Sequence, residues 1–123
     1  MIEVQGLRKS FQSRGGAIVA VDGASFVARD GEITGLLGPN GAGKTTTLRM
    51  LTGLARPTAG SATIDGVTVR ADDPAVRRSI GLLDQAPRFY GWMRGRELIE
   101  LAGRLAGLDG TALTARATAV LEQ

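Results

Sequence analysis

One stretch of the sequence fits the pattern G-x-x-x-x-G-K-[ST] of the phosphate-binding loop (P-loop): Gly38-Pro39-Asn40-Gly41-Ala42-Gly43-Lys44-Thr45-Thr46. The glycines of this pattern lack a Cβ, so the backbone can curl tightly and adopt positive φ. Successive N–H groups then form a concave nest for an anion, and the positive N-terminal end of the following helix adds to it. We therefore expect Lys44 to reach the β- and γ-phosphates of a nucleotide and the Thr45 hydroxyl to bind Mg²⁺.

The residues on either side of the loop predict the elements that a P-loop requires. Residues 32–37 (Glu-Ile-Thr-Gly-Leu-Leu) form a short apolar run, which predicts a buried strand. Residues 45–52 predict a helix with Leu48, Leu51 and Thr52 on one face. Strand, glycine-rich loop and helix is the order of the motif, so this context disfavours a glycine-rich turn that matches by chance.

The composition limits the size of the core and the available chemistry. The chain has 123 residues, of which 43% are hydrophobic and 4% aromatic, so it is one small domain or part of one. It contains no cysteine and no histidine, which excludes disulfides, the usual zinc sites and histidine acid–base catalysis. No apolar run approaches the roughly 20 residues that span a bilayer. The formal net charge of +3 comes mostly from scattered arginines, which disfavours nucleic-acid binding.

Short β-prone runs predict the strands of the first part of the chain. They are residues 2–7, 18–21, 24–27, 32–37, 61–64, 67–69 and 80–83. We expect the first strand to end at residues 9–11 and a polar, glycine-bearing loop to follow at residues 12–17. Asp22-Gly23 indicates a turn or bulge between two strand segments. Asp65-Gly66 between two β-prone runs indicates a hairpin.

Helical signals dominate the end of the chain. Residues 72–78 predict a capped helical turn, with acidic residues early and arginines late. Apolar residues with helical spacing predict two further helices, separated by residues 109–111. The spaced residues are Leu98, Leu101, Ala102, Leu105 and Leu108, then Leu113, Ala117, Val120 and Leu121. No glycine or proline follows the second helix, so we expect the chain to end inside an architecture.

The P-loop and its surroundings resemble a known family. Residues 37–46, followed by Gly53-Leu54 and Pro57-Thr58-Ala59-Gly60, resemble the nucleotide-binding domain of ATP-binding cassette (ABC) transporters. Residues 20–26 are similar to the family's approach to the P-loop, and residues 77–85 to the strand that ends at its Q-loop glutamine. The resemblance covers essentially the whole chain.

The resemblance implies an α/β fold: a P-loop NTPase core with an N-terminal antiparallel β subdomain and the start of a helical subdomain. Residues 1–123 would form the N-terminal part of an ABC-type ATP-binding domain, a truncated one. The β subdomain and P-loop core would occupy about 1–85, and the start of the helical subdomain about 95–123. Residues 96–108 are similar to the ATP-binding subunits of bacterial export systems for drugs, antibiotics, lipids or sodium.

The resemblance also implies a site for ATP and Mg²⁺. Phe11 matches the aromatic residue that stacks on adenine, with a packing role as the alternative. Val21 would lie beside the base or ribose, unless it belongs to the core. Gln85 matches the Q-loop residue, so Lys44 and Gln85 would act in catalysis, and Thr45 and Gln85 would bind the metal. The implied nucleotide contacts are Phe11, Val21, Asn40, Gly41, Ala42, Gly43, Lys44, Thr45 and Thr46.

Some features of the family differ here or are absent. Asp84 stands where the family commonly has proline, and it could alter Mg²⁺ binding or face solvent. Residues 89–93 are rich in aromatics, expected either near a membrane partner or packed within the local helical lobe. Trp92-Met93-Arg94 differs from the usual acidic and polar stretch. The signature loop, the Walker B aspartate, the catalytic glutamate, the D-loop and the switch histidine would lie beyond Gln123.

Three functions fit the sequence. The resemblance implies the ATP-binding subunit of an ABC exporter, which hydrolyses ATP and pairs head to tail with a second ATP-binding subunit. It would lie in the cytoplasm, where a transmembrane permease subunit would hold it at the inner face of the cell membrane. The alternatives are a truncated nucleotide-binding module without hydrolysis and a soluble cassette ATPase of DNA repair or translation. A nucleotide kinase fits less well, because several strand segments precede this P-loop.

Overall fold

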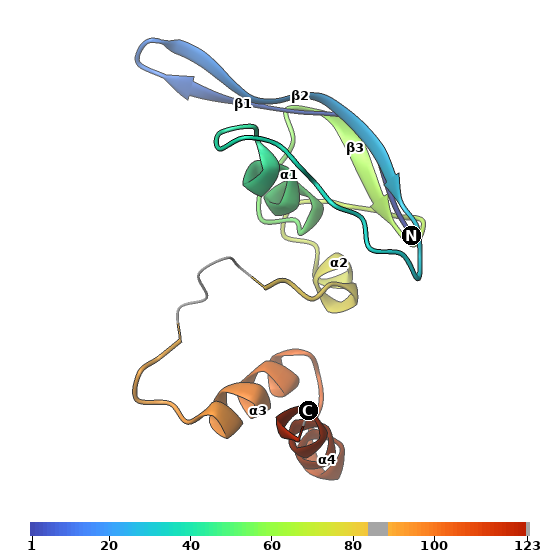
Figure 1. The fold of residues 1–123 in the computed structure, drawn as a ribbon, viewed down its shortest axis with the longest axis vertical. Coiled ribbons are helices and arrows are strands. Elements are labelled where there is room, and N and C mark those ends of the chain that lie inside the picture. Colours follow the sequence, from blue (N-terminus) through green and yellow to red (C-terminus); the bar gives the residue numbers. More distant parts are fainter. Residues whose placement is uncertain (84–88, 123) are drawn as a thin grey trace. The chain divides into compact units, whose positions relative to one another are not determined.

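An antiparallel β-sheet occupies the N-terminal part of the chain (Figure 1). The computed structural model describes residues 1–83 and 89–122, and the chain divides into two compact units, Met1–Leu82 and Leu83–Gln123. Within the described residues of the first unit, the strand order is β2-β1-β3-β4. The strands are β1 (Ile2–Ser13), β2 (Gly16–Ala28), β3 (Ala59–Ile64) and β4 (Val67–Thr68). This sheet confirms the antiparallel β layer that the resemblance implied.

The hairpin of β1 and β2 is longer than the sequence predicted. β1 continues through Phe11, which pairs with Ile18, and the strands close at the pair Ser13 and Gly16. The predicted loop at residues 12–17 and the early end of the first strand are therefore wrong. The reason is that ladder hydrogen bonds join backbone groups, so a polar stretch pairs as well as an apolar one.

A bulge in β2 confirms the irregularity predicted at Asp22-Gly23. Leu7 pairs with Ala24 and Lys9 pairs with Val21, so β2 advances three residues where β1 advances two. Gly23 supplies the positive φ of 72° at this point. The extra residue lets β2 run on as one strand, whereas the sequence alone suggested two segments.

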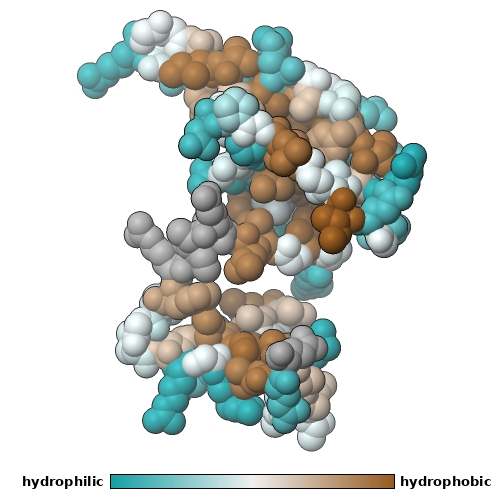
Figure 2. Space-filling model, viewed as in Figure 1, coloured by the Kyte–Doolittle hydropathy of each residue, from teal (hydrophilic) through white to brown (hydrophobic). Residues whose placement is uncertain are grey.

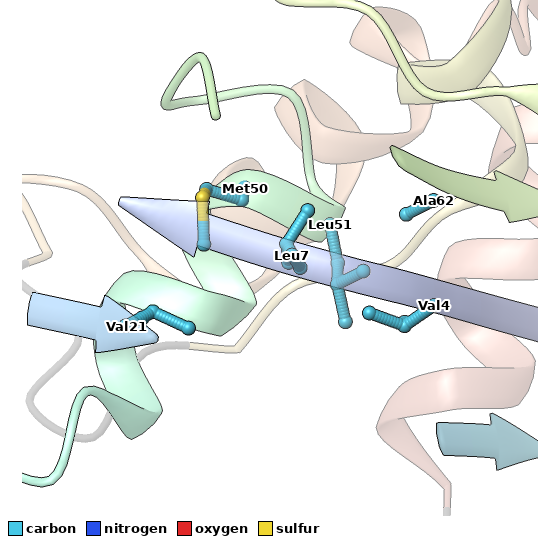
Figure 3. Packing of buried hydrophobic residues seen from close by; sticks show 6 residues of the cluster. All are labelled: Val4, Leu7, Val21, Met50, Leu51 and Ala62. Atoms are coloured by element: carbon cyan, nitrogen blue, oxygen red, sulfur yellow. The ribbon is translucent and has the colours of Figure 1, made fainter. Parts of the chain in front are cut away.

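Helix α1 (Lys44–Leu51) packs against the sheet and completes the core of the first unit. Its buried residues are Thr47, Met50 and Leu51, at the spacing i, i+3, i+4. Leu48 and Leu51 were predicted on one face of the helix, but Leu51 is 6% exposed and Leu48 is 46% exposed. Spacing alone did not fix the rotation of the helix, because leucine also occurs on exposed faces. Figure 3 shows the buried cluster: Val4, Leu7, Val21, Met50, Leu51 and Ala62.

The hairpin of β3 and β4 confirms the signal at Asp65-Gly66. Ile64 pairs with Val67, and both turn residues have positive φ, 50° for Asp65 and 77° for Gly66. These are the features of a type I′ turn, whose twist matches that of the strands. Helix α2 (Pro74–Ser79) then confirms the predicted helical turn.

Two segments predicted as buried strands lie outside any strand among the described residues: residues 32–37 and 80–83. Ile33 is 104% exposed and Leu37 is 92% exposed, so the apolar run before the P-loop is not covered. Figure 2 accordingly shows apolar side chains on the surface of the first unit. Both strand predictions are wrong for this structure. They rested on apolar runs, but a parallel strand also needs neighbouring strands at its edges, and the described residues supply none.

The second unit contains α3 (Gly95–Leu105) and α4 (Gly110–Leu121), where the apolar spacing predicted helices. α4 buries Leu113 and Ala117. The two helices approach closely at Gly103, where an added Cβ would lie 2.4 Å from the Leu113 Cδ1 atom. Within the two described ranges, no helix has the length and apolar character needed to cross a membrane.

Candidate functional site

The P-loop has a conformation that requires glycine at its end. Gly43 has a φ of 81°, in the left-handed region that side chains disfavour. An added Cβ at Gly43 would lie 2.2 Å from the Ala20 carbonyl oxygen and 2.9 Å from the Val21 Cγ2 atom. Within the loop, the Ala42 N–H donates a hydrogen bond of 3.2 Å to the Pro39 carbonyl oxygen. The loop therefore curls against β2 at a distance that leaves no room for a side chain.

The loop ends in an uncapped helix N-terminus. Gly43 is the N-cap of α1 and provides no side-chain hydrogen bond. Its carbonyl oxygen accepts the first bonds of the helix, 2.8 Å from the Thr47 N–H and 3.0 Å from the Thr47 hydroxyl. The N–H groups of Lys44, Thr45 and Thr46 precede those bonds, so the helix offers them no acceptor one turn earlier. Such an end favours an anion by roughly 0.3–1 kcal/mol through the helix dipole, in addition to direct hydrogen bonds.

The Lys44 ammonium lies at the loop. Its Nζ atom donates to the carbonyl oxygens of Gly38 at 2.6 Å and Pro39 at 2.7 Å. These bonds place a full positive charge beside the N-terminal end of α1. A phosphate oxygen forms stronger, charge-assisted hydrogen bonds with an ammonium than neutral carbonyls do. The arrangement is therefore suited to a phosphorylated ligand with several negative charges.

Val21 and Phe11, the two residues expected near the base, lie in different environments. Val21 is 7% exposed and belongs to the core cluster that packs under the P-loop. This placement agrees with the alternative that Val21 is a core residue, and a contact with nucleotide stays a prediction. Phe11 is 47% exposed on β1, so its ring is open to a partner, and its stacking role also stays a prediction.

The other predicted site residues have a known position only in part. Thr45 is exposed in the first turn of α1, and Asn40, Gly41 and Ala42 are exposed in the loop. Gln85 and the neighbouring Asp84 lie outside the described residues, so their predicted roles stay predictions.

One residue near the site was not singled out from the sequence. Lys9 donates a hydrogen bond of 2.6 Å from its Nζ atom to the Arg56 carbonyl oxygen. The same Nζ atom lies over the Phe11 ring, 5.1 Å from its centroid. The available signal was the i, i+2 spacing of Lys9 and Phe11, which places two side chains on one face of a strand.

The aromatic segment before α3 is exposed. Phe89 is 61% exposed, Tyr90 is 60% exposed and Trp92 is 77% exposed. The Tyr90 and Trp92 rings contact each other with centroids 5.5 Å apart. The expected contact of this segment with a membrane partner stays a prediction.

A glycine-rich loop that leads into a helix N-terminus, with a lysine in the first helical turn, defines the class of P-loop nucleotide-binding proteins. The contacts of Gly43, Thr47 and Lys44 place this chain in that class. The family model described as "ABC transporter" matches residues 21–123, and the chain belongs to this family. The resemblance noted from the sequence is thereby confirmed.

Curated relatives with similar sequences are named as ATP-binding proteins. The doxorubicin resistance ATP-binding protein DrrA of Mycobacterium tuberculosis is 46% identical over 122 residues, which are 99% of this chain and 36% of the relative. The uncharacterized ABC transporter ATP-binding protein YxlF of Bacillus subtilis is 43% identical, over 89% of this chain and 34% of the relative. Nod factor export ATP-binding protein I of Ralstonia nicotianae is 38% identical, over 99% of this chain and 37% of the relative. The chain thus spans about a third of the length of these relatives.

Solved structures of the family share the fold. The dimeric structure of MJ0796, described as a bacterial ABC transporter cassette, superposes with a TM-score of 0.85 at 25% identity. The match covers 99% of this chain and 55% of that one. A structure described as an ATP binding subunit of an ABC transporter gives a TM-score of 0.75 at 31% identity, over 89% of this chain and 44% of the other. These matches confirm the predicted P-loop NTPase fold.

Proposed function

We propose that this chain holds the phosphate-binding half of an ATP site and that the complete protein is the ATP-binding subunit of an ABC exporter. The observation that carries the proposal is the P-loop itself, in which Gly43 caps α1 without a side chain and Lys44 lies at the loop. The complete subunit would hydrolyse ATP and use the free energy to export a drug, another small molecule or a lipid. Relatives named for doxorubicin resistance and for Nod factor export support this direction of transport.

We assign the phosphates of ATP to the backbone of Asn40–Thr46 and to the Lys44 ammonium. The exposed Thr45 hydroxyl in the first turn of α1 fits a single oxygen ligand of Mg²⁺. The metal would neutralise negative charge that develops on the phosphates, and Lys44 would add to that stabilisation. Phe11 would stack on adenine, and Gln85 would bind the metal and orient the attacking water.

The proposal includes two protein partners. A transmembrane permease subunit would hold the protein at the inner face of the cell membrane. A second ATP-binding subunit would close head to tail on the nucleotide, and the dimeric form of the similar bacterial cassette MJ0796 supports such a pair. The exposed aromatic residues Phe89, Tyr90 and Trp92 are suited to the contact with the permease.

The test of the proposal is the loss of ATP binding when the charge at the loop is removed. Lys44→Ala should weaken ATP binding by about 10- to 100-fold, because a hydrogen bond to a charged group contributes roughly 1.5–3 kcal/mol. Arg49→Ala is the matched control, since Arg49 is a basic residue in the last turn of the same helix, away from the loop. Isothermal calorimetry measures both variants. Equal ATP affinity for Lys44→Ala and Arg49→Ala would refute the site.

A further inference from the structure

We propose that Lys9 is a positioning residue for the nucleotide base, because it orients the Phe11 ring on which adenine would stack. The inference rests on the proposed ATP site and adds a residue to it. The Lys9 Nζ atom lies over the Phe11 ring at 5.1 Å from the centroid, which is within the range of a cation–π interaction. The same atom donates a hydrogen bond of 2.6 Å to the Arg56 carbonyl oxygen. Lys9 therefore links an exposed aromatic ring to a fixed backbone acceptor.

The strand register brings this pair next to the P-loop. Lys9 pairs with Val21 across the hairpin, and Phe11 pairs with Ile18, further toward the turn. Val21 in turn contacts the loop, where its Cγ2 atom lies 2.9 Å from the position of an added Cβ at Gly43. Lys9 is thus the cross-strand neighbour of Val21, the residue that touches the loop. Phe11 lies two residues further along β1. A base attached to phosphates in the loop would meet this part of β1.

The backbone carbonyl that accepts the hydrogen bond of Lys9 is itself well fixed. Arg56 belongs to the segment that follows α1, and this segment is joined to β1 at two further points. The Thr58 N–H donates to the Arg8 carbonyl oxygen at 2.8 Å, and the Ser10 N–H donates to the Thr58 hydroxyl oxygen at 3.0 Å. The acceptor for Lys9 therefore moves with β1. A ring that is already oriented loses less conformational entropy when a base stacks on it.

The expected effect is small but selective for the base. Phe11 is 47% exposed, and a cation–π contact at an exposed site corresponds to about a two- to fivefold change in an equilibrium constant. Lys9→Ala should weaken ATP binding by that factor. It should leave the binding of inorganic tripolyphosphate unchanged, because that ligand fills the phosphate site and has no base. Arg14→Ala is the matched control, since it removes one positive charge from the turn of the same hairpin.

The experiment is calorimetry with ATP and tripolyphosphate on the complete protein and its variants. Three results are expected together. Lys9→Ala weakens ATP alone, Lys9→Arg restores it, and Lys9→Ala added to Phe11→Ala causes no further loss, because Lys9 acts through the ring. Melting curves confirm that each variant is folded.

Other outcomes overturn the inference in distinguishable ways. If Lys9→Ala weakens ATP and tripolyphosphate equally, Lys9 acts on the phosphates and not on the ring. If its effect is undiminished in the Phe11→Ala background, the two residues are independent. If Lys9→Ala binds ATP as the wild type does, only the positioning role is wrong. If the wild type binds neither ligand, the proposed ATP site is wrong, and the role of Lys9 is lost with it.

Discussion

At the scale of single residues, Gly43 and Gly41 differ in a way that separates backbone strain from steric contact. Both have similar φ, 81° and 85°, but an added Cβ at Gly43 would lie 2.2 Å from the Ala20 carbonyl oxygen, whereas at Gly41 it meets nothing within 4 Å. Gly41→Ala should therefore cost only the strain of positive φ, about 1–2 kcal/mol. Gly43→Ala should cost more and also displace the loop from β2.

Urea denaturation of the two variants measures this difference, and ATP affinity measures the displacement. We expect a clearly lower midpoint for Gly43→Ala than for Gly41→Ala, together with weaker ATP binding. Equal midpoints would mean that β2 yields to the new methyl group and that the close approach is not a constraint. The motif predicted that glycine is needed here. It did not predict Ala20 as the reason, because that contact depends on how β2 runs.

At the scale of elements, the sequence predicted the turns, bulges and helices that depend on neighbouring residues. The hairpin turn at Asp65-Gly66, the bulge at Asp22-Gly23 and the helix after the P-loop all depend on residues close in sequence. The length of the β1–β2 hairpin was underestimated, because the residues at its tip, 12–17, are polar or small and resemble a loop in sequence, although their backbone groups pair. For α1, Leu51 lies on the buried face and Leu48 does not, because the spacing of apolar residues does not fix the rotation of a helix against a sheet.

The two leucines of α1 test which face of the helix supports the core. Leu51 is 6% exposed and Leu48 is 46% exposed, so the same substitution removes different contacts. Leu51→Ala should lower the free energy of unfolding by about 2–5 kcal/mol, as is typical for a buried leucine. Leu48→Ala should change it by roughly 0.5 kcal/mol or less, as is typical of surface positions. Chemical denaturation followed by circular dichroism gives both values, and similar losses for the two variants would contradict the packing of α1.

At the scale of the whole molecule, the class could be predicted from the sequence because the P-loop motif is contiguous and specific. The family could be predicted because the residues around the motif, up to residue 85, resemble it as well. The pairing of residues 32–37 and 80–83 could not be predicted. Parallel strands pair through partners far apart in sequence, so an apolar run indicates burial without naming its neighbours. In the structure both runs lie outside any strand among the described residues, and Leu37 and Leu83 are exposed. Gln85, the predicted catalytic partner of Lys44, follows the second run and lies outside the described residues.

The division between binding and catalysis gives a prediction for residues 1–123 on their own. They contain the P-loop and Lys44, and they contain no histidine and no counterpart of the family's signature loop or catalytic glutamate. Transfer of a phosphoryl group to water depends on a positioned water and on charge stabilisation around the transferred group, which a phosphate cradle alone does not provide. We therefore expect this polypeptide to bind ATP weakly and to release phosphate no faster than its Lys44→Ala variant. A fluorescent ATP analogue verifies binding in the same samples in which phosphate release is measured. Turnover clearly above the Lys44→Ala background would show that these residues suffice for catalysis and that the further parts implied by the resemblance are not required.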